Sequence, residues 1–225
     1  MTEQIAVLFD MDGVIFDSER AQRACWLEIA EKEGLSDMEA VYARCIGVTM
    51  EVTGGILQEA YGEAFPWRDF RRRTTEMYLA RYKGGRLPLK PGAKELLKAL
   101  HEKAVPLALA SSTQAPLVER WLKDAGLLGY FDAIITGDMV TKSKPDPEIF
   151  LKACKMLNVK PADATVIEDS YNGVRAGFAG GMHTLMVPDL LPPSAEMREK
   201  AEKIFPSLRE VERYFEEIGI LATDP

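Results

Sequence analysis

The segment from Ile5 to Ser18, IAVLFDMDGVIFDS, constrains the fold more than any other part of the sequence. It begins with five apolar residues, a run that is typical of a strand buried on both faces of a parallel sheet. Asp10, Asp12 and Gly13 follow at its carboxyl end. Because ligands of open α/β sheets bind just beyond the strand ends, this position favours an acidic functional site. The simpler alternative is that both aspartates only stabilise a turn.

Further strand-like runs alternate with helical patterns along the rest of the chain. Four of them are predicted at 106–110, 133–136, 165–167 and 184–187. Such alternation predicts an α/β fold, a doubly wound, Rossmann-like parallel sheet with helices on both faces. The C-terminal stretch is predicted to hold two helices. The second opens with a capping box at Ser207 and is expected to bury Val211, Tyr214, Phe215 and Ile218.

Residues 18–88 carry helical patterns and no strand-like run. We therefore predict a core domain formed by residues 1–17 and 89–225, interrupted by an inserted all-helical domain at 18–88. Ser18 is expected to cap the first inserted helix, which ends at Gly34. Further breaks are expected near Gly47, Gly54-Gly55, Gly62 and Pro66.

Composition excludes several classes of protein. Apolar residues make up 47% of the 225, enough to fill a core, and no stretch approaches the ~20 apolar residues of a membrane span. The formal charge of −7 argues against nucleic acid. The one basic run, Arg71-Arg72-Arg73, is interpreted as a solvated helix face. Three widely spaced cysteines indicate free thiols. With no basic region before the short first apolar run, we expect a cytoplasmic protein.

Three later segments complete a pattern that the first one begins. They are ALASST (108–113), KSKPDPEIF (142–150) and VIEDSYNG (166–173), and each follows or ends an apolar run. In order and chemistry, the four segments resemble the four motifs of the haloacid dehalogenase (HAD) superfamily of phosphoryl-transfer enzymes, and more narrowly its β-phosphoglucomutase-like branch. The resemblance runs from Ile5 to about Pro188. It implies the strand order 5-4-1-2-3 and a mobile cap formed by the inserted helices.

The resemblance also implies roles for four catalytic residues. Asp10 would be the nucleophile that forms an aspartyl-phosphate, and Asp12 would carry the proton. The halide-removing branch lacks the second aspartate, so Asp12 favours phosphate chemistry. Ser111 would donate a hydrogen bond to a phosphate oxygen, or alternatively cap the next helix. Lys144, directly before a proline as in the family motif, would supply a fixed cation, whereas Lys142 is interpreted as solvated.

Glu168 and Asp169 are adjacent acids that should repel each other and the first motif's carboxylates. A cation resolves that conflict, and ligands that are all oxygen favour Mg²⁺. The predicted metal site uses Asp10, the Asp12 backbone carbonyl, Asp169, and Glu168 directly or through water. The alternative is that the acid pair only caps the following helix.

Substrate choice in this family depends on the cap. The predicted substrate-binding residues are Gly13, Gln22, Gly47, Ser112, Thr113 and Asn172. β-Phosphoglucomutases carry a histidine where this chain has Gln22, and a phosphate-gripping arginine where it has Met50. Arg44 or Arg81 is a possible substitute for that arginine. We therefore expect a Mg²⁺-dependent phosphatase for a small phosphorylated metabolite, most simply a sugar phosphate.

Two alternatives stay open at this stage. One is a sugar-phosphate mutase, and the other is a binding protein on a retired enzyme scaffold. The expected partner is a small phosphorylated substrate, with no nucleic acid and no membrane, and we expect a monomer.

Overall fold

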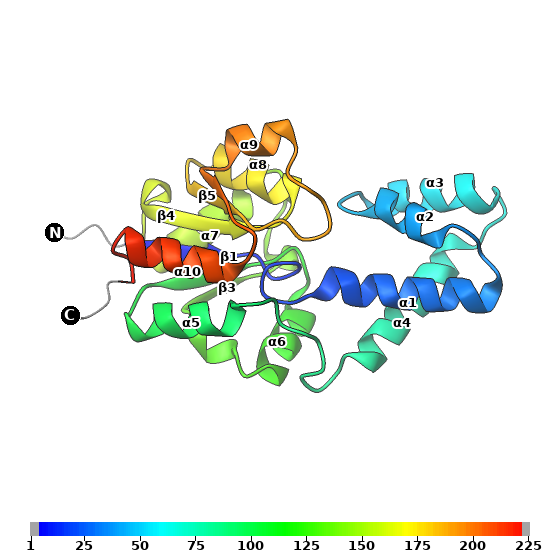
Figure 1. The fold of residues 1–225 in the computed structure, drawn as a ribbon, viewed down its shortest axis with the longest axis horizontal. Coiled ribbons are helices and arrows are strands. Elements are labelled where there is room, and N and C mark those ends of the chain that lie inside the picture. The colour runs from blue at the N-terminus through cyan, green and yellow to red at the C-terminus, as the bar shows by residue number, and fades with distance from the viewer. Residues whose placement is uncertain (1–4, 222–225) are drawn as a thin grey trace.

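A computed structural model describes residues 5–221 and contains a six-stranded, all-parallel sheet (Figure 1). The strand order is β3-β2-β1-β4-β5-β6, so the predicted doubly wound fold and the order of its first five strands are confirmed. The strands are β1 (Ala6–Phe9), β2 (Leu107–Ala110), β3 (Ala133–Ile135), β4 (Ala164–Glu168), β5 (His183–Met186) and β6 (Lys203–Ile204). β6 was not predicted, because a two-residue strand shows no periodicity.

Helices cover both faces of the sheet because alternate residues of each strand point to opposite sides. Val7 and Phe9 of β1 pack with the helices on one face, and Ala6 and Leu8 pack with those on the other. The first face carries α5 (Ala93–Glu102), α6 (Ala115–Asp124) and α10 (Leu208–Glu217). The second carries α7 (Glu148–Leu157) and α8 (Tyr171–Ala179), with α9 (Ala195–Lys200) packed on α8.

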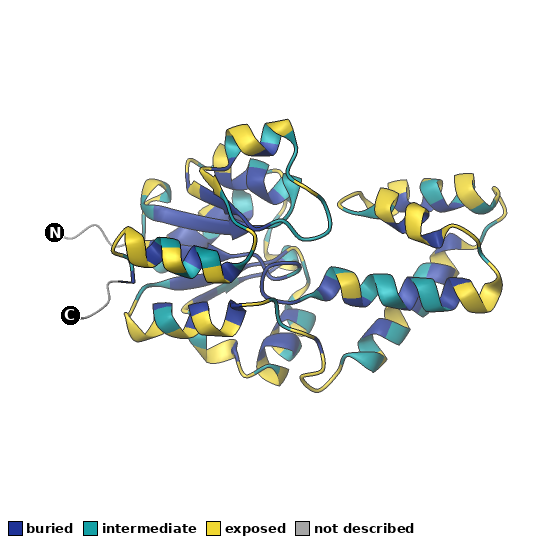
Figure 2. Ribbon diagram, viewed as in Figure 1, coloured by how far each residue is buried: buried dark blue, intermediate teal, exposed yellow. Residues whose placement is uncertain are grey.

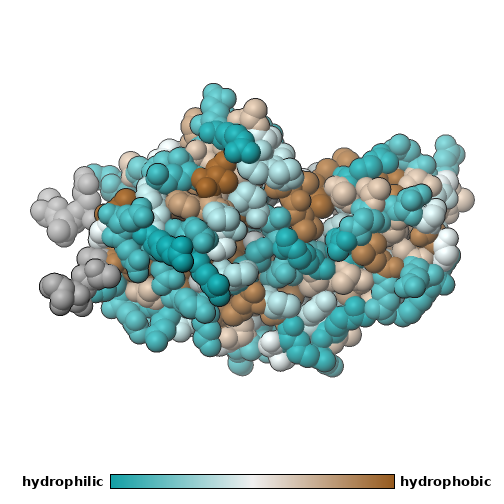
Figure 3. Space-filling view, viewed as in Figure 1, coloured by the Kyte–Doolittle hydropathy of each residue, from teal (hydrophilic) through white to brown (hydrophobic). Residues whose placement is uncertain are grey.

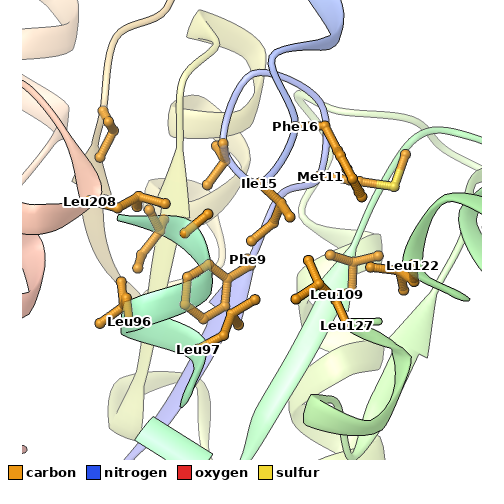
Figure 4. Close-up of a cluster of buried hydrophobic side chains, with 14 of the residues drawn as sticks. Phe9, Met11, Ile15, Phe16, Leu96, Leu97, Leu109, Leu122, Leu127 and Leu208 are labelled. Atoms are coloured by element: carbon orange, nitrogen blue, oxygen red, sulfur yellow. The ribbon is translucent and has the colours of Figure 1, made fainter. Parts of the chain in front are cut away.

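Phe9 occupies the centre of the first apolar layer, close to Leu96, Leu97 and Leu109 (Figure 4). Burial is concentrated in the strands and the inward sides of the helices (Figure 2). Short 3-10 helices at η1 (Leu128–Tyr130), η2 (Gly137–Met139) and η3 (Pro161–Asp163) lie in the connections. The core therefore holds the strand ends rigidly, which is what a site at those ends requires.

Four helices between β1 and β2 pack around an apolar cluster of their own, beside the sheet (Figure 1). They are α1 (Ser18–Glu33), α2 (Met38–Cys45), α3 (Met50–Tyr61) and α4 (Trp67–Arg81). We call them the cap helices. Their cluster is centred on Trp26, Leu57 and Phe70. The domain limits at residues 18 and 88 stay a prediction. Residues 1–4 and 222–225 lie outside the described residues.

A buried charge cluster connects the start of the cap helices to the core. The side chain of Asp189, in the loop after β5, is fully buried and accepts hydrogen bonds from Lys90 Nζ at 2.5 Å and from Arg20. Lys90 follows the last cap helix, and its Nζ also lies 3.8 Å from a carboxylate oxygen of Asp17, which precedes the first one. Both chain crossings are therefore attached to the same core loop.

Three local predictions are wrong. Gly54 and Gly55 lie inside α3 and break no helix, because Gly54 faces the Trp67 ring, where a side chain has no room. Ser18 does not cap α1; its hydroxyl is buried without a partner, and Asp17 takes the capping position without a side-chain bond. Ile218 is half-exposed beyond the end of α10.

No helix formed by residues 5–221 is long and apolar enough to cross a membrane.

The two adjacent glycines of α3 provide a matched pair of variants. A Cβ on Gly54 would lie 2.4 Å from the Trp67 ring, whereas a Cβ on the exposed Gly55 would meet nothing within 4 Å. We expect Gly54→Ala to lower the free energy of unfolding by about 1–3 kcal/mol through overpacking. Gly55→Ala should raise it by about 0.5–1 kcal/mol, because alanine loses less backbone entropy in a helix. Urea denaturation measures both, and equal effects would contradict the α3–α4 packing.

Candidate active site

The site begins where three neighbouring strands end. β1 lies between β2 and β4, and Phe9 is in register with Leu109 and with Ile167. Asp10, one residue beyond Phe9, therefore lies level with the end of β2 and with Glu168 of β4. Its backbone N–H still donates to the Ile167 carbonyl at 3.0 Å, so the sheet ladder fixes its position. The parallel register is the reason why residues far apart in sequence meet here.

Lys144 is the centre of the polar contacts at these strand ends. Its ammonium donates to Asp10 Oδ1 at 2.6 Å, to Glu168 Oε1 at 2.7 Å and to the Ala110 carbonyl at 3.0 Å. The lysine side chain is only 6% exposed. All three ammonium donors are thus satisfied in a site that largely excludes water, and the predicted convergence of Asp10, Lys144 and Glu168 is observed. Lys142, in contrast, is exposed.

Glu168 is held by four donors. Besides Lys144, its Oε2 accepts from the backbone N–H groups of Asp169 at 3.0 Å and Ser170 at 2.9 Å, and from the Ser170 hydroxyl at 2.9 Å. Gly173 leaves the space for this carboxylate, since a Cβ there would lie 1.8 Å from it. Because both Glu168 oxygens already accept protein hydrogen bonds, this residue is suited to fixing Lys144.

Asp10 is held on one oxygen only. No hydrogen bond to its second oxygen, Oδ2, is found among residues 5–221. Burial raises the pKa of Asp10, and the charges of Glu168 and Asp12 raise it further, while Lys144 opposes them. Burial by itself would lower the pKa of Lys144, but Asp10 and Glu168 outweigh it and raise that pKa. The ammonium therefore stays charged.

A third carboxylate, Asp169, makes the cluster suitable for a divalent cation. Oxygen atoms of Asp10, Glu168 and Asp169 all lie within 4.8 Å of one another. Burial, followed by the charges of Glu168 and Asp10, raises the pKa of Asp169 well above its usual range. Three carboxylates beside one ammonium leave an excess of two negative charges, which a dication such as Mg²⁺ compensates.

Gly13 makes room for the Asp169 carboxylate. A Cβ on Gly13 would lie 2.3 Å from Asp169 Oδ2, and its φ of +79° is one that glycine tolerates best. The residues present therefore fit a metal ion. Whether the Asp12 backbone carbonyl is a further ligand stays a prediction.

A cavity of about 770 Å³ lies above these strand ends, between the core and the cap helices. Figure 3 shows the hollow between the two parts, with apolar residues on its walls. The predicted residues that line the cavity are Asp10, Asp12, Gln22, Gly47, Ser112, Thr113, Lys144, Glu168, Asp169 and Asn172.

Ser111 does not line the cavity, although it was predicted to contact phosphate. It is fully buried, and its hydroxyl accepts a hydrogen bond from the Thr113 N–H at 3.1 Å. Thr113 in turn donates from its hydroxyl to Asp12 Oδ2 at 2.8 Å. The sequence did not reveal this contact, because it joins the end of β2 to the loop after β1. It fixes the orientation of the second aspartate. The catalytic role of Ser111 stays a prediction.

Glu19 and Tyr42 lie on the cap side. Glu19 of α1 lines the cavity, and its Oε2 accepts a hydrogen bond from the Tyr42 hydroxyl at 3.1 Å. Burial, and next the charge of Asp12, raises the pKa of Glu19. The sequence offered no signal for Glu19 beyond its place near the start of a helix. A carboxyl group therefore faces the core acids from the cap.

Arg71 corrects the interpretation of the basic run as a solvated face. Arg72 is exposed, but Arg71 is half-buried and lines the cavity. Helical spacing carries a signal for this, since Trp67, Thr74 and Tyr78 define a buried stripe on which position 71 falls. The two proposed substitutes for the mutase arginine, Arg44 and Arg81, do not line the cavity; they pair with Glu59 and Glu28.

Comparison with known proteins places this geometry in a family. The family model for haloacid dehalogenase-like hydrolases matches residues 7–187. A phosphorylated carbohydrates phosphatase from Thermotoga maritima is 37% identical over 181 residues, which cover 80% of this chain and 83% of that one. A β-phosphoglucomutase from Bacillus subtilis is 33% identical over 190 residues, 81% of this chain and 82% of that one.

Solved structures agree with the sequence relatives. A HAD family hydrolase from Deinococcus radiodurans R1, crystallised with bound phosphate and sodium, superposes with a TM-score of 0.84 at 28% identity. The match covers 100% of both chains. The likeness therefore extends over the core and the cap helices.

The excess of negative charge at the site predicts how a change of Asp169 affects the stability of the metal-free protein. Because folding raises the pKa of Asp169, the folded state holds its proton at a pH where the unfolded state has lost it. In chelator at pH 7, we expect Asp169→Asn to be more stable than the parent by about 1–2 kcal/mol. The difference should shrink as the pH falls towards 4, where the unfolded carboxyl is protonated too.

Magnesium should reverse this order. A metal that binds only the folded parent stabilises it by about 2.7 kcal/mol at roughly a hundred times its Kd, and Asp169→Asn should gain far less. Urea denaturation of the parent and the variant at both pH values, with chelator or Mg²⁺, measures the eight free energies. An asparagine variant that is less stable than the parent without metal would contradict the charge excess.

Proposed function

This chain belongs to the haloacid dehalogenase-like hydrolases, and on that premise we propose that it is a Mg²⁺-dependent phosphatase. Its substrate is a small phosphorylated metabolite, most simply a sugar phosphate, and the reaction proceeds through an aspartyl-phosphate. The observation that carries the proposal is the buried Lys144 ammonium, which holds one oxygen of Asp10 and leaves the other free at the floor of the cavity.

The first step forms a covalent intermediate. Asp10 Oδ2 attacks phosphorus, the ester P–O bond breaks, and the leaving oxygen takes the proton of Asp12. Lys144 keeps Asp10 aimed, because Glu168 and the Ala110 carbonyl fix the ammonium from the other side. Its positive charge also lies where negative charge develops on the phosphoryl oxygens.

The second step regenerates the enzyme. Asp12, now a carboxylate, takes a proton from a water molecule, and the water oxygen attacks phosphorus. The bond to Asp10 breaks, inorganic phosphate leaves, and the Asp10 carboxylate is restored. The Thr113 hydroxyl hydrogen bond to Asp12 Oδ2 keeps the second oxygen, Oδ1, directed for proton transfer in both steps.

Asp10 and Asp169 would hold the Mg²⁺ ion, with Glu168 contributing through water because its oxygens are occupied. When bound, the ion neutralises charge on the phosphoryl oxygens and lets a carboxylate approach them.

Relatives support the substrate class and both catalytic outcomes. One is named a phosphorylated carbohydrates phosphatase, and another a β-phosphoglucomutase. The hydrolytic outcome is favoured because Met50, where the mutase arginine would be, is 50% exposed and does not line the cavity. A retired scaffold is disfavoured, since Asp10, Asp12 and Lys144 are all present and oriented. A cytoplasmic monomer without nucleic-acid or membrane partners remains our expectation.

Removing the nucleophile tests the chemistry. We expect Asp10→Asn to lower kcat on any hydrolysed sugar phosphate by about 10⁴-fold or more, as for other covalent nucleophiles. In the parent, acid quenching during turnover and peptide mass spectrometry should find a phosphoryl group on Asp10. Asp12→Ala should both form and lose that phosphoryl group more slowly, because it lacks the acid of the first step and the base of the second. Label on another residue, or an asparagine variant with parental activity, would overturn the mechanism.

The same assay distinguishes the two outcomes. With β-glucose 1-phosphate as substrate, a phosphatase releases one inorganic phosphate per glucose. Accumulation of glucose 6-phosphate without released phosphate would establish the mutase instead.

A further inference from the structure

Three cationic side chains line the cavity, and two of them are already engaged by acids. Lys144 binds Asp10 and Glu168. Arg175 donates to Glu196 at 2.5 and 2.8 Å. Arg71 is the third, and within residues 5–221 its side chain has no ion pair and no hydrogen bond. A lining guanidinium without an acceptor is a feature that a ligand can use.

The position of Arg71 is costly without a ligand. Its Nε atom is buried and unsatisfied, and its guanidinium carbon lies 4.9 Å from the centre of the Trp26 ring. Burial lowers the pKa of the guanidinium, yet an arginine stays protonated. A buried, charged donor without a partner costs free energy, which a bound acceptor would recover.

The groups around Arg71 do not neutralise it. The ionisable neighbours that act on its charge are Tyr42, Cys45 and Glu19. Glu19 is the one carboxyl among them, but it lies beyond ion-pair distance and is engaged by the Tyr42 hydroxyl. The opposite wall of the cavity carries the catalytic acids. A substrate whose phosphate lies at Asp10 can therefore direct its other end towards an unpaired cation.

We propose that Arg71 binds an anionic group at the end of the substrate remote from the transferred phosphate. The preferred substrates are then sugar phosphates that carry a second anion, either a carboxylate or a second phosphate. The planar guanidinium fork matches both groups through paired N–H donors. A cavity of about 770 Å³ is in the size range of small-molecule sites and accommodates such a compound. This inference rests on the proposed phosphatase function.

The competing role for Arg71 is structural. Stacking over Trp26 could by itself stabilise the packing of α4 against α1. Loss of that stacking would lower stability and reduce the turnover of every substrate alike. Loss of an anion-binding group would instead change the preference between substrates. The two roles therefore differ in selectivity, which matched substrates can measure.

Matched pairs of substrates test the proposal. One pair is glucose 6-phosphate and 6-phosphogluconate, which differ in a carboxylate, and the other is fructose 6-phosphate and fructose 1,6-bisphosphate. We expect the parent to have the higher kcat/KM for the anionic member of at least one pair. Arg71→Gln should lower that preference by about tenfold to a hundredfold, the effect of a charged hydrogen bond. Arg71→Lys should restore part of it. Which pair responds identifies the anion.

Arg72→Gln is the matched control. Arg72 lies on the same helix, but it is exposed and pairs with Asp69 and Glu76. Its loss should leave the preference unchanged, and thermal unfolding should show whether either variant alters stability. An equal loss of kcat/KM on both members of each pair in Arg71→Gln would assign Arg71 a structural role and overturn the proposal. A parent without any preference would do the same.

Binding separates failure of this inference from failure of the proposed function. In an Asp10→Asn background, calorimetry gives the Kd of each of the four compounds without turnover. We expect the added Arg71→Gln change to weaken the anionic member of the pair by about tenfold or more relative to the neutral one. If the parent hydrolyses none of the esters, the proposed function fails, while this measurement still decides the role of Arg71. Equal weakening of both members would contradict it.

Discussion

The site depends on one buried ammonium that compensates carboxylates from two strands. Lys144 contacts Asp10 at the end of β1 and Glu168 at the end of β4. Without it, these acids would face each other in a site that excludes water, where like charges are strongly unfavourable. One ammonium cannot balance three carboxylates, so Asp169 leaves a charge excess that a dication such as Mg²⁺ would compensate. A bound dication would remove the charge imbalance that destabilises the metal-free fold.

Backbone geometry rather than side-chain bulk creates the space for this arrangement. Gly13 and Gly173 lie where a Cβ would overlap the carboxylates of Asp169 and Glu168. The strand register sets the position of each acid along the strand direction. The hydroxyls of Ser170 and Thr113 then fix the side chains of Glu168 and Asp12 by hydrogen bonds. The core thus supplies chemistry from rigid elements. The cap helices supply the opposite wall of the cavity. Arg71 gives that wall a positive charge, which is complementary to a phosphorylated substrate.

The alternation of strands and helices made the core predictable from sequence. The cap helices were harder to predict, because their packing depends on tertiary contacts. Asp10 and Glu168 could be brought together from sequence because parallel strands end at one edge of a sheet, whereas Lys144 was placed beside them by the resemblance to the family motif. β6 has only two residues and gave no periodic signal. From the local sequence, Gly54 is predicted to break a helix. The Trp67 ring that occupies the space of its side chain belongs to another helix, so the local sequence carries no sign of this contact. The charge of Arg71 predicts an exposed side chain, but its helical spacing from Trp67 and Tyr78 puts it on the buried stripe of α4.

A double-mutant cycle between Lys144 and Glu168 tests the central interaction most directly. The free energies of unfolding of the parent, Lys144→Met, Glu168→Gln and the double variant are measured in urea with chelator. Lys144→Met alone should cost about 3–5 kcal/mol, because it leaves buried carboxylates without their cation. The two changes together should cost less than their sum by about 2 kcal/mol or more, as expected for groups in contact. Additive costs, or a methionine variant as stable as the parent, would contradict the account.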